Sequence, residues 1–296
     1  MVKKSLSRYN GLNNNYKDNK MIYGVRLGSL GNQMHIVAAT YATAIDMQTD
    51  WAISNKTNEG YHGGIKRSSF NDTFFRSAIK KGPPTGHKSF SEGAFKYRHI
   101  TKHKNLILKG YFQSDKYYGH RKNEIIDLFY EFYPEVQDKV QGWFNHMDQN
   151  KTISLHIRRT DYVKLAKVHH VQPMEYYESG INAIAEKQNI SPEQLKQDYH
   201  FLVFSDDLEW CKNQDFFKSL HCTFVDNQES PDLNAIIDLY TMAQCKHNII
   251  ANSSFSWWSA YLNKHEDKIV VAPKQWFGPR GPKYWEDIYT ENMIIL

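Results

Sequence analysis

The sequence predicts an α/β protein made of two Rossmann-like domains that face a cleft. Apolar stretches of strand length alternate with amphipathic stretches of helix length, the pattern of parallel βα units. This alternation occurs twice, on the two sides of a polar region near residues 135–150. The chain has 296 residues, which suits two domains of about 150 residues each.

The first half opens with a predicted buried strand, "MIYGVRL" (21–27), followed by a glycine-containing turn, "GSLGNQ" (28–33). Apolar residues then recur at helical spacing, which predicts a helix over 32–48. Further strands are predicted at 51–54 and 105–114, and a helix over 122–133 that Pro134 ends. Residues 55–103, which include "KGPPTGHK", are predicted to be a long excursion with short elements.

The second half repeats the rhythm with shorter connections. Strands are predicted at 152–158, 199–205, 222–226, 247–251 and 268–272. Helices are predicted at 174–187, 207–213, 232–245 and 254–263. We therefore divide the chain into a loosely held tail (1–20), an N-terminal domain (21–145) and a C-terminal domain (146–296).

Composition excludes several classes of protein. The net charge of +5 is mild and its cations are spread along the chain, which argues against a nucleic-acid-binding protein. No stretch has the roughly 20 apolar residues of a membrane span, and "MVKKSLSRYNGLNNNYKDNK" lacks the apolar core of a signal peptide. Cys211, Cys222 and Cys245 show neither disulfide nor zinc spacing, so a cytoplasmic protein with reduced thiols is expected.

Four polar stretches follow predicted strands, where doubly wound sheets bind their ligands: "GSLGNQ", "HIRRTD", "FSDD" and "ANSSFSWW". Side chains alternate along a strand, so His156 and Arg158 should point one way and Arg159 the other. A guanidinium suits phosphate oxygens, so Arg158 is expected to reach a diphosphate while Arg159 pairs with Asp161. On this basis Arg159→Ala should lower Tm more than Arg158→Ala. The alternative is that both arginines form only bracing ion pairs.

The stretch "ANSSFSWW" opens a predicted helix, with Asn252 or Ser253 as its N-cap. The free N–H groups of a helix start favour phosphate, although an ordinary capped helix has the same pattern. Trp257 and Trp258 are predicted to pack in the core near Tyr261. Asp206 and Asp207 suit a metal, the N1–H and N2 amine of guanine, or a simple helix cap, but no third acid nearby completes a metal site.

Several blocks together resemble the alpha-1,2-fucosyltransferases of glycosyltransferase family 11. They are "LGNQM" (30–34), "GYFQSDKYY" (110–118), "HIRRTDYV" (156–163), "FSDDLEWCK" (204–212) and "HNIIANSSFSWWSAYLN" (247–263), in family order. Thr160 departs from the glycine of the common "HIRRGDY" and resembles the alpha-1,6-fucosyltransferases. This departure bears on which linkage to the acceptor is formed, alpha-1,2 or alpha-1,6.

The resemblance implies a GT-B type fold, with GDP-L-fucose in the C-terminal domain and the acceptor sugar across the cleft. It implies that Arg158 grips the diphosphate and stabilises the leaving GDP, while Arg159 and Asp161 hold the loop. His156 and Asp207 would read guanine, and Asn32 would approach the fucose. The serines implied to meet the diphosphate are Ser253, Ser254 and Ser256.

The implied reaction is transfer of L-fucose from GDP-β-L-fucose to the 2-hydroxyl of a galactoside, with inversion. Because a fixed cation can stabilise the leaving group, no metal and no cofactor are expected. The general base is left open among His169, His170 and Glu175.

The remaining alternatives are a fucosyltransferase of another linkage such as alpha-1,6, a sugar-nucleotide binder without turnover, and a basic nucleic-acid-binding protein. The expected partners are GDP-fucose and a galactose-containing glycan, with no nucleic acid and no transmembrane segment. Peripheral contact with a membrane and the oligomeric state are left open.

Overall fold

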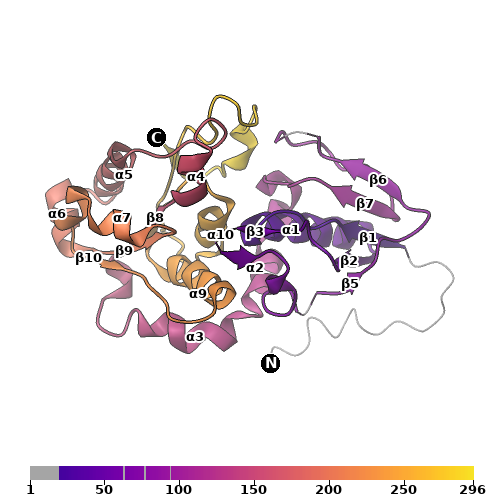
Figure 1. The fold of residues 1–296 in the computed structure, drawn as a ribbon, viewed down its shortest axis with the longest axis horizontal. Helices are drawn as coiled ribbons and strands as arrows, with labels where there is room; N and C mark the ends of the chain where they lie inside the picture. Colours follow the sequence, from indigo (N-terminus) through magenta and orange to yellow (C-terminus); the bar gives the residue numbers. More distant parts are fainter. Residues whose placement is uncertain (1–19, 63, 77, 94) are drawn as a thin grey trace.

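The protein has two lobes that lie side by side, each built around a parallel sheet (Figure 1). This architecture comes from a computed structural model that describes residues 20–296 except 63, 77 and 94. The tail predicted over 1–20 lies outside the described residues, apart from residue 20. Two sheets with helices around them confirm the predicted pair of Rossmann-like domains.

The N-terminal sheet has the order β5-β2-β1-β7-β6, and all of its pairs are parallel. Its strands are β1 (Met21–Gly24), β2 (Asp50–Ser54), β5 (Lys80–Lys81), β6 (Lys88–Ser91) and β7 (Leu106–Lys109). The region predicted as a long excursion supplies β5 and β6, together with the antiparallel hairpin β3 (Tyr61–His62) and β4 (Ile65–Lys66). These strands are too short to show a two-residue alternation, so periodicity did not identify them.

The C-terminal sheet has the order β10-β9-β8-β11-β12-β13 and is also parallel throughout. Its strands are β8 (Thr152–Ile157), β9 (His200–Ser205), β10 (Cys222–Phe224), β11 (His247–Ile249), β12 (Val270–Ala272) and β13 (Met293–Ile295). All but the edge strand β13 were predicted. The central strand β8 is buried along its whole length, as parallel strands covered on both faces are.

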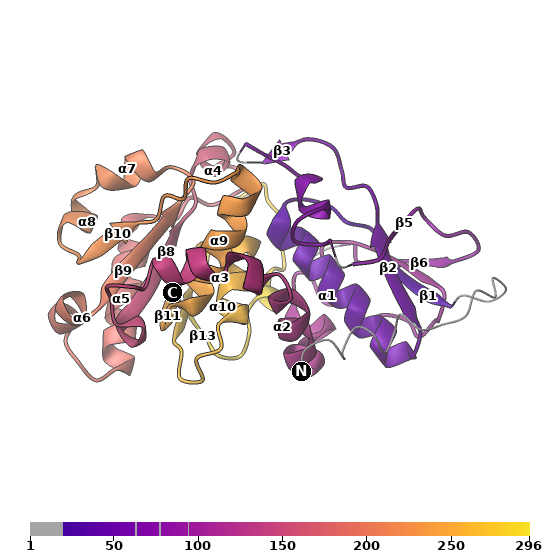
Figure 2. The same ribbon diagram turned by 90° about the horizontal axis from the view of Figure 1, so that it is seen from below.

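Helices pack against both sheets, and most of them lie around the C-terminal one (Figure 2). They are α1 (Leu30–Met47), α2 (Lys122–Tyr130), α3 (Tyr133–Gly142), α4 (Thr160–Lys164), α5 (Met174–Lys187), α6 (Pro192–Asp198), α7 (Leu208–Lys212), α8 (Asp215–Lys218), α9 (Pro231–Gln244) and α10 (Ser254–Leu262). Short 3-10 helices lie at Ser69–Asn71, Asp115–Tyr117, Gly119–Arg121, Gln149–Lys151 and Glu286–Ile288. The predicted helix bounds of 174–187, 207–213, 232–245 and 254–263 agree with α5, α7, α9 and α10 within a residue at each end.

The predicted helix over 122–133 is two helices. α2 ends at Tyr130, and Pro134 lies in the first turn of α3, where the N–H that proline lacks has no partner within the helix. α3 packs against α9 of the C-terminal lobe, and the Trp143 indole N–H donates to Asn227 Oδ1 at 3.1 Å. The last helix assigned to residues 21–145 is therefore packed on the second lobe.

The two lobes meet where α1 packs against α10. A Cβ on Gly31 would lie 2.6 Å from the carbonyl carbon of Ser254, so only glycine allows this approach. Trp257 and Trp258 are fully buried here, and Trp257 stacks on Tyr261 with ring centroids 4.9 Å apart. The prediction that both tryptophans pack in the core is confirmed, and one hydrophobic core continues through both lobes.

Candidate functional site

A cavity of about 670 Å³ lies between the lobes. The four polar stretches expected at strand ends all contribute to its lining: Gly28 to Asn32, His156 with Arg158, Ser205 with Asp206, and Asn252 to Phe255. Because both sheets are parallel, the carboxyl ends of their strands point toward this shared space. The cavity thus lies at the strand ends where the sequence predicted the site.

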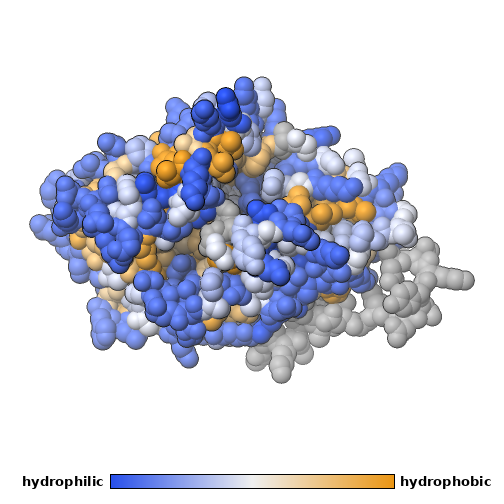
Figure 3. Space-filling model, in the orientation of Figure 1, coloured by the Kyte–Doolittle hydropathy of each residue, from blue (hydrophilic) through white to orange (hydrophobic). Residues whose placement is uncertain are grey.

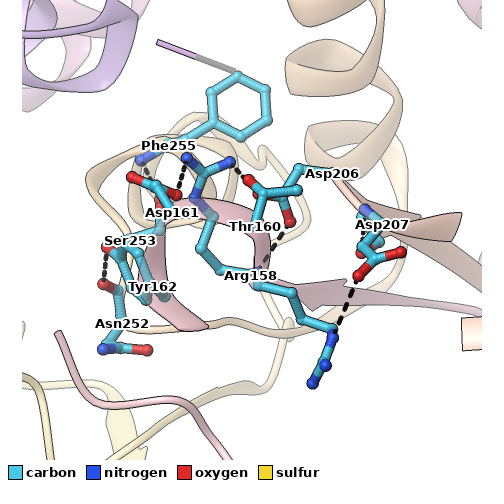
Figure 4. A network of polar contacts seen from close by, with 11 residues as sticks. Arg158, Thr160, Asp161, Tyr162, Asp206, Asp207, Asn252, Ser253 and Phe255 are labelled. Carbon is cyan, nitrogen blue, oxygen red and sulfur yellow. Dashed lines mark hydrogen bonds and ion pairs between the residues drawn. The ribbon is translucent and has the colours of Figure 1, made fainter. Parts of the chain in front are cut away.

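Arg158 lines the cavity between two carboxylates. Its Nη2 lies 2.5 Å from Asp161 Oδ1, and its Nη1 lies 2.7 Å from Asp206 Oδ2 (Figure 4). Only 10% of its side chain is exposed, and its guanidinium carbon lies 5.5 Å from the centre of the Tyr162 ring. The charge of this guanidinium is therefore fixed in position by the surrounding side chains.

Arg159 points out of the cavity, but its predicted partner was wrong. Its Nε lies 3.4 Å from Asp207 Oδ2, and its guanidinium carbon lies 3.4 Å from the centre of the Trp210 ring. Asp161 pairs with Arg158 instead. The reason is that β8 ends at Ile157, so the chain turns into α4 before Asp161 and brings this acid back to the face of Arg158.

Asp206 connects the two arginine residues. It accepts a hydrogen bond from the Arg159 backbone N–H at 2.8 Å, another from the Thr160 hydroxyl, and it pairs with Arg158. The side chain of Asp207 instead accepts from the Trp210 backbone N–H and caps α7, away from the cavity. The guanine contact predicted for Asp207 is thus not supported by its position, because Asp207 does not line the cavity.

A further acid, Asp238 of α9, lines the cavity, as does His156. Burial raises the pKa of the Asp238 carboxyl to about 7, and Asn227 Nδ2 donates to its Oδ1 at 2.7 Å. Burial and the charge of Arg158 lower the pKa of His156 to about 3, so His156 is neutral near pH 7. His156 Nδ1 is buried, and no described residue hydrogen-bonds to it.

Of the three serines predicted to contact the diphosphate, two line the cavity at the start of α10 and one does not. Ser253 is the N-cap and accepts from the Phe255 N–H, and Ser254 Oγ donates to Asn32 Oδ1 at 2.7 Å across the two lobes. Both line the cavity. Ser256 is fully buried and lies 3.4 Å from the carbonyl oxygens of Ala251 and Ser253, so its predicted contact with a ligand is wrong.

Asn32 enters the cavity from the N-terminal lobe, as predicted. Its Oδ1 also accepts from Gln113 Nε2 at 2.6 Å. The loop that carries Gln113 is held by the buried Glu92, whose Oε2 accepts from the backbone N–H groups of Tyr111 and Phe112, both at 2.8 Å. Phe112 has a φ of 52°, an unfavourable value for a bulky side chain, so this carboxylate stabilises a strained turn.

Of the three predicted bases, His169 alone lines the cavity. Its ring stacks on Tyr162 with centroids 4.4 Å apart, and burial lowers its pKa. His170 and Glu175 do not line the cavity: the His170 carbonyl accepts from Asn252 Nδ2, and Glu175 is exposed in the first turn of α5. The structure thus separates residues that the sequence placed in one loop.

The sequence prediction missed Asp238, Gln113 and Glu92. A signal existed for Asp238, because it is the one acid within the apolar helix stretch 235–243. Gln113 lies in the quoted block "GYFQSDKYY" but has no spacing of its own. Glu92 lies in the region without periodicity, and no pattern points to it.

In the described part of the chain, no helix has the length and apolarity to cross a bilayer. The same residues contain no group of three or more His, Cys, Asp or Glu side chains that could hold a metal ion.

The chain matches the model of glycosyl transferase family 11 over residues 66–296. It is 45% identical over 129 residues to the O-antigen biosynthesis glycosyltransferase WbnK of Escherichia coli, a match covering 43% of this chain and 39% of WbnK. It is 29% identical over 279 residues to an alpha-1,2-colitosyltransferase of the same species, which covers 84% of this chain and 90% of that protein.

A third relative is the mouse galactoside 2-alpha-L-fucosyltransferase Sec1, 29% identical over 177 residues, which are 56% of this chain and 44% of Sec1. The chain thus spans less than half the length of WbnK and of Sec1. Among solved structures, NodZ alpha-1,6-fucosyltransferase soaked with GDP-fucose aligns at 13% identity with a TM-score of 0.48, covering 83% of this chain and 93% of NodZ.

Proposed function

This chain belongs to glycosyl transferase family 11, and from that premise we propose that it transfers L-fucose from GDP-β-L-fucose to the 2-hydroxyl of a galactoside, with inversion. Relatives named as an alpha-1,2-colitosyltransferase and a galactoside 2-alpha-L-fucosyltransferase support the alpha-1,2 linkage. The observation that carries the proposal is the Arg158 guanidinium, fixed by two carboxylates beside the start of α10 in a GT-B cavity.

In this proposal the diphosphate lies between Arg158 and the first turn of α10. The N–H groups at the start of α10 and the hydroxyl groups of Ser253 and Ser254 supply hydrogen-bond donors for phosphate. As the bond between fucose and GDP breaks, negative charge grows on the β-phosphate. A cation that is already in place stabilises this charge without reorganising, so the reaction proceeds without a metal.

In this proposal the nucleobase lies against Asp238, which lines the cavity as His156 does. A carboxylate accepts hydrogen bonds from both the N1–H and the N2 amine of guanine, and it has no equivalent partners on uracil. Asp238 takes over the role predicted for Asp207, because Asp238 lines the cavity and Asp207 does not. This assignment makes GDP, and not UDP, the preferred nucleotide.

His169 is the general base that the position of the side chains favours. It lines the cavity, and its lowered pKa keeps the imidazole neutral near pH 7, the form that accepts a proton. The acceptor hydroxyl would lose its proton to His169 as it attacks the anomeric carbon. Replacing His169 with Gln should lower kcat while GDP affinity is retained, whereas unchanged kcat would exclude this role.

Colitose is the second candidate for the transferred sugar. It is fucose without the 3-hydroxyl, and the colitosyltransferase aligns with 84% of this chain. A site that hydrogen-bonds a hydroxyl rejects an analogue lacking it by a large factor, about 10⁴ or more in kcat/KM. Competition between GDP-fucose and GDP-colitose therefore identifies the donor.

The contacts of Thr160 remove the argument that this residue gave for the alpha-1,6 linkage. Its hydroxyl donates to Asp206 within the arginine cluster, so its role is to brace Asp206 and not to select an acceptor. The nucleic-acid alternative loses its main support, because both adjacent arginines are paired with carboxylates and are at most 16% exposed.

The test is a radiolabelled GDP-fucose assay over a panel of β-galactosides, with product linkage determined by NMR. We expect label at the galactose 2-hydroxyl. A folded protein that binds GDP but transfers label to no galactoside, or that forms another linkage, would overturn the proposal.

A further inference from the structure

The rim of the cavity carries a surface that exposes large apolar side chains next to cations. We name it the rim patch; its residues are Val163, Lys164, Leu165, Lys167, Arg280, Lys283 and Tyr284. Val163 is 48% exposed, Leu165 50% and Tyr284 66%, and the four cations are exposed as well. In Figure 3, hydrophobic atoms gather over α4 with strongly hydrophilic atoms directly above them.

The rim patch is held in a fixed shape by backbone hydrogen bonds between its two segments. Gly278 N–H donates to the Val168 carbonyl at 2.9 Å, and Arg280 N–H donates to the Lys167 carbonyl at 2.7 Å. A Cβ on Gly278 would lie 2.6 Å from the Ala166 carbonyl oxygen, so the segments are in close contact. The apolar side chains are therefore presented by an ordered support and do not belong to a loose loop.

The charge of the rim patch is uncompensated. Within the described part of the chain, no ion pair joins Lys164, Lys167, Arg280 or Lys283 to an acid. The neighbouring Asp161 pairs with Arg158, and Asp287 pairs with Lys116. Glu286 is the remaining exposed acid of this segment and forms no ion pair with these four cations, so the patch keeps a net positive charge.

The rim patch also continues into the cavity. Leu165 belongs to both, and Val168, Phe277 and Pro282 extend the apolar surface from the rim to the cavity wall. Whatever covers the patch therefore lies directly beside the cavity.

We propose that the rim patch docks on an anionic lipid surface, with the cavity entrance facing the bilayer. Exposed apolar side chains between Lys and Arg are typical of surfaces that rest at the boundary of headgroups and acyl chains. The cations are attracted to anionic headgroups, while Val163, Leu165 and Tyr284 leave water. An acceptor glycan carried on a lipid would then be delivered to the cavity at high local concentration.

Two other occupants fit the patch less well. A second copy of this chain, docked patch to patch, would bring four more cations against the first four, which repel at this distance. A nucleic acid would pair with the cations but leave the three apolar side chains in contact with a charged backbone. The combination of both features favours lipid.

The test is co-sedimentation of the full chain with vesicles of phosphatidylcholine alone or containing about one quarter phosphatidylglycerol. We expect binding to the anionic vesicles, weakened as salt screens the charges. The double variant Lys164→Glu/Lys167→Glu should lose at least about thirtyfold in partitioning, at about fivefold for each cation removed. Its matched control is Lys102→Glu/Lys104→Glu, which makes the same charge change on exposed lysines of the other lobe and should bind like the parent protein.

The apolar contribution is tested by Val163→Gln/Tyr284→Asn, where Asn suits the positive φ of 62° at position 284. We expect weaker binding to anionic vesicles but unchanged turnover of a soluble galactoside, because neither residue lines the cavity. The proposal would be overturned if these variants bound vesicles as well as the parent does, or if the lysine control lost as much binding as Lys164→Glu/Lys167→Glu. It would also be overturned if the protein bound heparin but not vesicles. Since vesicle binding is read without any activity, its outcome is separate from that of the proposed reaction.

Discussion

The two adjacent arginines offer the sharpest test of the site, because the structure gives them different partners. Arg158→Ala leaves the carboxylates of Asp161 and Asp206 without their cation. Removing one partner of a fully buried pair costs about 3–5 kcal/mol. Here Asp206 is 14% exposed and keeps two hydrogen bonds, and Asp161 is 30% exposed. We therefore expect Arg158→Ala to lower the free energy of unfolding by a smaller amount, about 2–3 kcal/mol.

Arg159→Ala removes weaker interactions. Its ion pair is 3.4 Å long with an Asp207 that is 35% exposed, a pair of about 0.2–1 kcal/mol. Its contact with the Trp210 ring adds about 0.5–1 kcal/mol. We therefore expect Arg159→Ala to lower the free energy of unfolding by about 1–2 kcal/mol. Arg158→Ala should then have the lower Tm of the two variants. This order is the reverse of the one predicted when Arg159 was assigned to Asp161.

The activities should differ more than the stabilities. Losing one preorganised donor in the transition state lowers kcat by about 10²–10³, or about 2.7–4 kcal/mol. Arg158→Ala should show this loss, and Arg159→Ala should stay within about tenfold of the parent. Arg158→Lys keeps a charge beside Asp206 but not the planar fork, so its Tm should recover more than its kcat.

The assay measures kcat with a soluble galactoside, GDP affinity by calorimetry, and thermal melting, for all three variants and the parent at one pH. Each kcal/mol should shift Tm by about 2 °C in a chain of this size. Near-normal turnover in a folded Arg158→Ala, or a lower Tm for Arg159→Ala than for Arg158→Ala, would refute the reasoning.

The other predictions concern the nucleobase end, the Glu92 loop and the metal. Because the Asp238 carboxyl has a pKa raised to about 7 by burial and only its anion accepts both guanine donors, GDP affinity should fall as pH drops below about 7. Asp238→Asn should remove this slope and the preference for GDP over UDP; a slope that persists excludes the assignment. Glu92→Ala leaves two backbone N–H groups unpaired and displaces Gln113, the hydrogen-bond partner of Asn32. It should therefore raise the KM for GDP-fucose with a smaller effect on kcat. Glu92→Gln keeps an accepting oxygen and should restore most of the lost affinity. Unchanged KM in a folded Glu92→Ala would contradict this positioning role. Activity should persist in excess EDTA; a loss that Mg²⁺ or Mn²⁺ restores would show that a metal takes part.

The sequence by itself determined the two parallel sheets and the edge at which the site lies. Long apolar strands such as 152–157 and amphipathic helices such as 174–187 have periods that depend only on local geometry, and parallel order follows from their alternation. The polar stretches after these strands were located for the same reason. The short strands β5, β6 and β13 could not be predicted, because their pairing partners define them.

Only the tertiary structure decided which side chains meet. Asp161 turns back to Arg158 since β8 ends at Ile157, and Ser256 is buried because α10 turns its third position toward the carbonyls of Ala251 and Ser253. Asp238 reaches the cavity from a helix whose other residues form the core, and Glu92 acts on a loop about 20 residues away through contacts that no spacing encodes. Periodicity fixes which face a residue occupies within its own element, whereas partners from different elements are set by how those elements pack.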